Sequence, residues 1–90
     1  MPKEVKHRLQ QTLDRLALGQ PTTNTELQYF IDKLTPTMET LEVLGQKYYL
    51  AYKELRHEIM QMHTFLNERQ EKGVEYMEIG DKIVPIKTIQ

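Results

Sequence analysis

The chain has 90 residues and no cysteine, so it forms one small domain that neither a disulfide nor a thiolate metal site can stabilise. Twelve basic and thirteen acidic residues leave a formal net charge of −1, which gives no overall field to attract nucleic acid or anionic lipid. No apolar run approaches the roughly 20 residues that span a bilayer, and the polar segment 1–11 has no signal-peptide core. We therefore expect a cytoplasmic protein without membrane contact, stabilised by packing or association.

Residues 2–18 are predicted to form the first helix, with Gly19 just past its end as a C-cap. One face carries the apolar side chains of Val5, Leu9, Leu13, Leu16 and Ala17. The exposed side is mildly basic, through Lys3, Lys6, Arg8 and Arg15. A solvated helix face is the simpler interpretation, and a phosphate-binding face is the alternative.

Residues 24–34 are predicted to form the second helix. Thr23 and Glu26 have the spacing of a capping box, in which each side chain satisfies a free backbone donor of the other residue. Four apolar residues at helical spacing should be buried: Leu27, Phe30, Ile31 and Leu34. Because proline disfavours helical geometry in the residue before it, we expect a sharp turn at Thr35 and Pro36.

Residues 36–72 give the longest helical pattern, with Thr35 as the N-cap, Pro36 at the first helical position and Gly73 at the end. Apolar side chains recur at spacings of three and four, at Leu44, Tyr48, Ala51, Leu55, Ile59, Met62 and Leu66. An unbroken helix of this length would extend roughly 55 Å. Either Gly45 breaks it near its start, or part of it projects and is covered by another chain. We favour the second arrangement.

Residues 74–89 change to the alternating pattern of a β-hairpin with a two-residue turn at Gly80 and Asp81. In this register Pro85 opposes Tyr76, and one face carries Met77, Ile79, Val84 and Ile86. We expect the ribbon to lie on the helices with that apolar face covered. The predicted fold class is therefore mainly α, with two short helices and one long helix followed by a C-terminal two-stranded β-hairpin, in a single domain spanning residues 1–90.

A cluster of tyrosines is the strongest candidate for a functional surface. Tyr49, Tyr52, Met60 and His63 lie on one shoulder of the long apolar stripe and widen it towards half the helix circumference, more than one neighbouring helix covers. Tyrosine is enriched at interfaces because it combines a large apolar area with a polar tip. The alternative is that Tyr48 lies in the core while Tyr49 and Tyr52 contact the first helix or the ribbon. The predicted partner-binding residues are Tyr48, Tyr49, Tyr52, Met60 and His63.

Catalytic and metal chemistry are weakly supported by the sequence. Glu54 and His57 have the Glu-x-x-His spacing of di-iron bundles, but a second such pair is missing. Glutamine at position 61 breaks the zinc-protease spacing that starts at His57. The chain contains no serine or cysteine and no glycine-rich phosphate loop. We predict no catalytic residue, no metal site, no cofactor and no small-molecule substrate.

The predicted function is a small non-catalytic protein-interaction module. We expect it to form a homodimer through the long helix and to bind or inhibit a second, unidentified protein. One alternative is a nucleic-acid-associated regulator that uses the basic face of residues 2–18, although nucleic acid is not the expected partner. Another is an enzyme with a site at a dimer seam, using His57, Glu54 or Tyr49. By composition alone, the chain is similar to accessory proteins of bacteria and phages.

Overall fold

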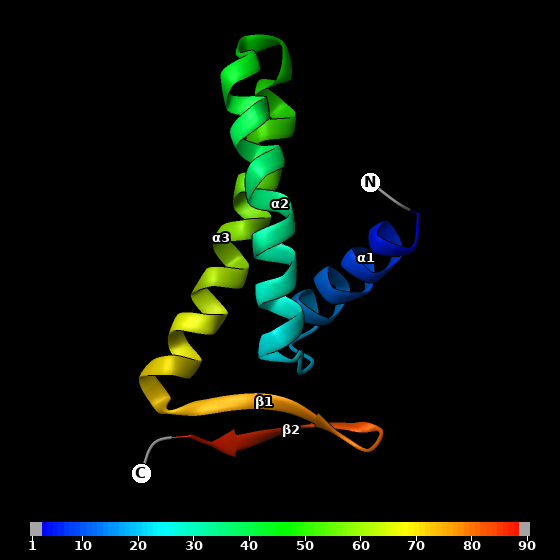
Figure 1. The fold of residues 1–90 in the computed structure, drawn as a ribbon, viewed down its shortest axis with the longest axis vertical. Helices are drawn as coiled ribbons and strands as arrows, with labels where there is room; N and C mark the ends of the chain where they lie inside the picture. Colours follow the sequence, from blue (N-terminus) through cyan, green and yellow to red (C-terminus); the bar gives the residue numbers. More distant parts are fainter. Residues whose placement is uncertain (1–2, 89–90) are drawn as a thin grey trace.

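The computed structural model describes residues 3–88, and Figure 1 shows their arrangement. Within this range the chain is mainly helical, with two strands at its C-terminal end, which confirms the predicted fold class. The elements in order are α1 (Lys3–Ala17), α2 (Asn24–Leu44), the single 3-10 turn η1 (Gln46–Tyr48), α3 (Tyr49–Lys72), β1 (Val74–Ile79) and β2 (Lys82–Lys87). Pro2 and Ile89, the outer limits of the predicted first helix and hairpin, lie outside the described residues.

Helices α2 and α3 run antiparallel as a helical hairpin, which we call the stalk (residues 24–72). Figure 1 shows α1 leaving the base of the stalk at an angle, while the β-ribbon lies across that base. The principal extents are 47 × 28 × 20 Å, and the radius of gyration is 14.5 Å. A compact chain of this length would have a radius of gyration near 12 Å. The far end of the stalk therefore projects beyond the packed part of the molecule.

The prediction of one helix over residues 36–72 is wrong, because the chain reverses at Gly45. Gly45 has φ 85° and ψ −152°, a backbone region that is essentially open to glycine alone. Its N–H donates to the carbonyl of Glu42 at 3.2 Å and closes the end of α2. Apolar residues continue at helical spacing on both sides of Gly45, and this favours an unbroken helix. The spacing indicates which face of a helix is apolar, but it does not indicate where the helix ends. Residues 36–44 belong to α2.

The predicted break at Thr35 and Pro36 is also wrong, since α2 continues through both residues. Thr35 is not an N-cap; its hydroxyl donates to the carbonyl of Ile31 at 2.6 Å inside the helix. Proline removes one helical donor and crowds the preceding turn. Met38 nevertheless extends the apolar stripe beyond Pro36 and packs against the core. Packing on α3 outweighs the lost hydrogen bond, so the rule for residues before proline fails here.

The hydrophobic core lies in the half of the stalk nearest the base, where all three helices meet. Its members are buried apolar side chains from each of them: Leu9, Leu16, Leu27, Phe30, Ile31, Leu34, Ile59 and Met62. Half of the predicted capping box is confirmed, because the Thr23 hydroxyl accepts the Glu26 N–H at 3.0 Å, whereas the Glu26 carboxylate accepts from Arg8 and not from the Thr23 N–H. The C-cap is confirmed too, since Gly19 has φ 72° and the Gln20 N–H donates to the Arg15 carbonyl at 2.8 Å.

The ribbon has the predicted antiparallel register, including Met77 opposite Val84 and Tyr76 opposite Pro85. A positive φ at Gly80 but not at Asp81 is typical of a type II′ turn. The face that meets the helices is the opposite of the predicted one, because Tyr76 stacks on Arg69 of α3. Met77 and Ile79 stay 43% and 56% exposed, so the expectation that this chain covers their face is wrong.

Candidate partner-binding surface

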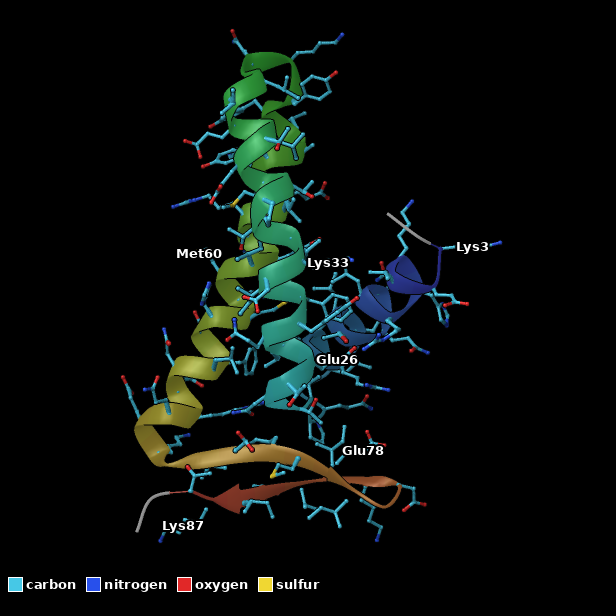
Figure 2. The ribbon with its side chains drawn as sticks, in the orientation of Figure 1. Lys3, Glu26, Lys33, Met60, Glu78 and Lys87 are labelled. Carbon is cyan, nitrogen blue, oxygen red and sulfur yellow. The ribbon has the colours of Figure 1, made fainter. Side chains whose placement is uncertain are left out.

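The two flanks of the stalk differ, because α1 covers only one of them. Arg8 of α1 donates to the Glu26 carboxylate on α2 at 2.7 Å, and its guanidinium carbon lies 5.0 Å from the Tyr29 ring centroid. Figure 2 shows Met60 on the side of α3 that faces away from α1. The flank carrying Met60 is therefore left uncovered by the first helix.

Two adjoining grooves occupy that uncovered flank near the far end of the stalk. The first, about 490 Å³, lies where α2 and α3 meet and is lined by Leu41, Glu42, Gly45, Gln46, Tyr49 and Tyr52. The second, about 410 Å³, follows α3 and is lined by Tyr49, Tyr52, Lys53, Arg56, His57 and Met60. Because Tyr49 and Tyr52 line both, the grooves form one continuous surface, which we call the tyrosine face. The residues that line it come from the stalk alone.

Three of the five predicted partner-binding residues come together on the tyrosine face. Tyr49 and Met60 are 50% and 51% exposed, and Tyr52 is half-buried between them. His63 is exposed on α3 and lines neither groove. Tyr48 lies in η1, 39% exposed, with the Lys47 ammonium 5.8 Å from its ring centroid. The structure therefore brings Tyr49, Tyr52 and Met60 together on one surface and leaves Tyr48 and His63 outside it. Partner binding by all five residues stays a prediction.

The tyrosine face has one acidic and one basic border. On α2, the exposed Glu42 lines the first groove, and the exposed Glu39 lies on the same face of the helix, three residues before it. On α3, Lys53 and Arg56 are exposed and carry positive charge, and the Lys53 ammonium lies 5.3 Å from the Tyr49 ring centroid. Within residues 3–88 the one ion pair closer than 4.0 Å is Arg8 with Glu26. The opposite charges of the two borders are therefore not paired within the chain.

Neither border was predicted from the sequence, although a signal for the basic one is present. Tyr49, Lys53, Arg56 and Met60 are spaced by four, three and four residues, which places them on one face of a helix. The prediction of the partner surface rested on apolar residues alone, so it did not include Lys53 and Arg56. The acidic border could not be assigned, since Glu39 and Glu42 were expected on the same helix as the tyrosines rather than across a groove from them.

A second polar cluster surrounds Arg69, near the C-terminal end of α3. Arg69 is 8% exposed, and its guanidinium donates to the Thr22 carbonyl at 2.7 Å, the Asn24 side-chain oxygen at 2.8 Å and the Thr22 hydroxyl at 3.3 Å. Burial lowers the pKa of Arg69, while Tyr76 opposes that shift. Its position seven residues after Met62, on the buried side, was the available signal. Its neutral partners indicate a structural clamp.

The residues considered for catalysis do not form a constellation in residues 3–88. Glu54 and His57 are both exposed on α3, and no group of three His, Cys, Asp or Glu side chains within that range could hold a metal ion. Burial raises the pKa of the neighbouring Glu58, the negative charge of Glu54 raises it further, and His57 lowers it. Glu58 is half-buried, and it is the acid in this part of α3 whose pKa is shifted.

Comparison with known protein families, curated proteins and solved structures finds no match for this chain. Across residues 3–88, none of the helices combines the length and the apolar character needed to cross a bilayer. The candidate surface consequently rests on its own geometry and chemistry.

Proposed function

We propose that this protein is a small non-catalytic interaction module, and that its tyrosine face contacts a macromolecular partner. The observation that carries the proposal is the half-exposure of Tyr49 and Met60 on the uncovered flank of a projecting stalk. Burying apolar area yields about 25 cal/mol per Å², and aromatic side chains at the centre of an interface contribute most to binding. The stalk presents such side chains away from the core.

The shape of the surface favours a macromolecule over a small ligand. Both grooves are open and lie end to end along the stalk, whereas small-molecule sites enclose most of their ligand. An apolar centre with charged borders is the usual anatomy of a protein interface. The partner is therefore proposed to be a protein that lays an apolar surface between the two charged borders.

The alternative functions have less support. Arg8 is the central cation of the basic side of α1, and its engagement with Glu26 and Tyr29 reduces the charge available for phosphate. A catalytic role for His57 or Glu54 would need further groups from a second protein, because both side chains are exposed and no group of three His, Cys, Asp or Glu side chains within residues 3–88 could hold a metal ion.

The test compares two neighbouring positions on α3. A photoreactive phenylalanine analogue is introduced at Tyr49, on the tyrosine face, or at Leu50, which is 81% exposed and points to another side of the helix. After illumination in cells of the source organism, Tyr49 should give discrete cross-linked products and Leu50 should give few. Equal labelling from both positions, or no product from Tyr49, would refute the proposed surface.

We further propose that the module acts in the cytoplasm. The chain has no cysteine, so an oxidising compartment could not stabilise it with a disulfide. Fractionation of cells that express the untagged protein is the direct test. Recovery in a membrane or extracellular fraction would contradict this location without affecting the assignment of the tyrosine face.

A further inference from the structure

We propose that a second copy of this chain covers the tyrosine face, in a parallel dimer that sets α2 of each protomer against α3 of the other. The inference rests on the proposed function, since it names the partner that the same surface takes. Four helices would then surround the apolar side chains of Leu41, Tyr49, Tyr52 and Met60.

The charges of the two borders favour a copy of this chain as the occupant. Glu39 and Glu42 border the face on α2, while Lys53 and Arg56 border it on α3, and these charges form no ion pairs with each other. A surface that carries opposite charges on its two sides is complementary to itself after a two-fold rotation. With a net charge of −1, two copies also repel each other little over long distances.

The same charges select the orientation of the two-fold axis. An axis parallel to the stalk places α2 of one protomer opposite α3 of its partner, so acidic borders meet basic ones. An axis across the stalk would place α2 opposite α2 and bring like charges together. Charge complementarity therefore predicts that both stalk tips lie at the same end of the dimer.

The heights of Glu39 and Lys53 along the stalk agree with this parallel arrangement. Glu39 and Lys53 are six and eight residues from Gly45, which puts them about 9 and 12 Å from the stalk tip at 1.5 Å per residue. A rotation about an axis parallel to the stalk preserves these heights. Glu39 of one protomer thus comes level with Lys53 of the other, and the pair forms twice by symmetry.

The available area is sufficient for a stable dimer. Helix α3 has 24 residues and is about 36 Å long, and two packed helices are about 20 Å wide. The whole flank of the stalk, of which the tyrosine face is the half nearest the tip, therefore offers an area on the order of 700 Å². A standard interface buries about 800 Å² on each partner. The chain has an extended shape, with a radius of gyration of 14.5 Å, and its projecting stalk leaves this flank accessible to a second copy.

The first experiment uses two reversed chains and analytical ultracentrifugation at about 100 µM, far above a micromolar Kd. One chain combines K53E with R56E, so both borders are acidic, and the other combines E39K with E42K, so both are basic. Wild type should sediment as a dimer of about 21 kDa, twice the chain mass of 10.7 kDa. Each reversed chain alone should have a Kd raised at least about tenfold, and their mixture should recover the dimer.

Circular dichroism shows whether the reversed chains keep their helices, and recovery of the dimer on mixing requires that both are folded. A dimer that both reversed chains form as tightly as wild type would overturn the proposed face. A wild-type monomer at this concentration would overturn self-association altogether.

The second experiment tests the orientation by disulfide cross-linking, since the natural chain has no cysteine. Gln46→Cys places a thiol at the stalk tip, and Gln11→Cys places one on exposed α1. Under mild oxidation the parallel dimer should cross-link through position 46 and not through position 11. If the dimer fails to cross-link at position 46, the stalk tips of the two protomers lie far from each other, which contradicts the parallel arrangement.

The two proposals can fail separately. If wild type is monomeric but the photoreactive group at Tyr49 still labels another protein, self-association is refuted and the proposed function stands. If Tyr49 labels nothing, including a second copy, both proposals fail.

Discussion

Arg69 of α3 stacks on the ring of Tyr76 in β1, with the guanidinium carbon 4.1 Å from the ring centroid. The Asn24 side-chain oxygen accepts both from this guanidinium and from the Tyr76 N–H, at 2.8 and 3.0 Å. One buried cation thus joins the C-terminal half of α3, the start of α2 and the ribbon. An isolated two-stranded ribbon is marginal in water, so this contact fixes it to the helices.

Arg69→Ala should lower the free energy of unfolding by about 3 kcal/mol, because it removes hydrogen bonds from a charged donor and leaves buried oxygens unpaired. Arg69→Lys should recover only part of the lost stability. Lysine keeps the positive charge, but its ammonium lacks the planar array of donors of the guanidinium. Urea denaturation at one fixed protein concentration measures both effects. Lys72→Ala, at the exposed end of the same helix, is the control and should cost under about 1 kcal/mol. Equal losses for Arg69 and Lys72 would contradict the clamp.

Pro36→Ala should stabilise the protein by about 2 kcal/mol. Alanine restores the helical donor that proline lacks, and the gain is reduced by the greater freedom of the unfolded chain. The side chain of residue 36 is exposed, so the replacement leaves no cavity. The measurement is the urea midpoint of both proteins at matched concentration. No change in stability would mean that a helix begins at Pro36, as the sequence first indicated.

Gly45→Ala should destabilise the stalk by about 1–3 kcal/mol through backbone strain at φ 85°. No atom lies within 4 Å of the Cβ that would be added, so the cost comes from the backbone and not from a clash. A synthetic chain with D-alanine at this position, whose preferred φ is positive, is the matched control and should retain wild-type stability. A harmless Gly45→Ala would show that the chain tolerates a continuous helix there.

Glu58→Gln should raise stability at pH 7 and have no effect at pH 3.5. The pKa of Glu58 is raised in the folded protein, mainly by burial, so the folded state binds the proton more tightly than the unfolded state. Stability contributed by this group is therefore present at low pH and falls as pH rises above its ordinary value of 4.5. Glutamine is neutral throughout and avoids that loss. Denaturation curves at the two pH values test this, and an equal effect at both would contradict it.

Fold class and strand register could be predicted from the sequence because both follow from strong local periodicity. Leu27, Phe30, Ile31 and Leu34 recur at helical spacing and are buried, and the alternation after Val74 fixes the pairing of Met77 with Val84. These patterns depend on neighbours a few residues away. They identify the type of an element even when its boundaries are misplaced.

The boundaries failed where a local rule competed with packing. Pro36 predicts a helix start and Gly45 a position inside a helix, yet the structure has the reverse, because α2 gains a longer contact with α3 when it passes through Pro36. Whether Pro36 or Gly45 ends the helix depends on the neighbouring helix against which α2 packs. Half of the candidate site was missed for the same reason, since Glu42 reaches Tyr49 only through the reversal at Gly45.

Pro85 limits how the protein can assemble at high concentration. In a non-hydrogen-bonded pair with Tyr76, its nitrogen points to the outer edge of β2, where it offers no donor, and Lys82 and Lys87 place charges at the two ends of that edge. Stacking of ribbons into cross-β fibrils is therefore disfavoured. Even when crowded, the molecules should stay in finite assemblies rather than grow into filaments.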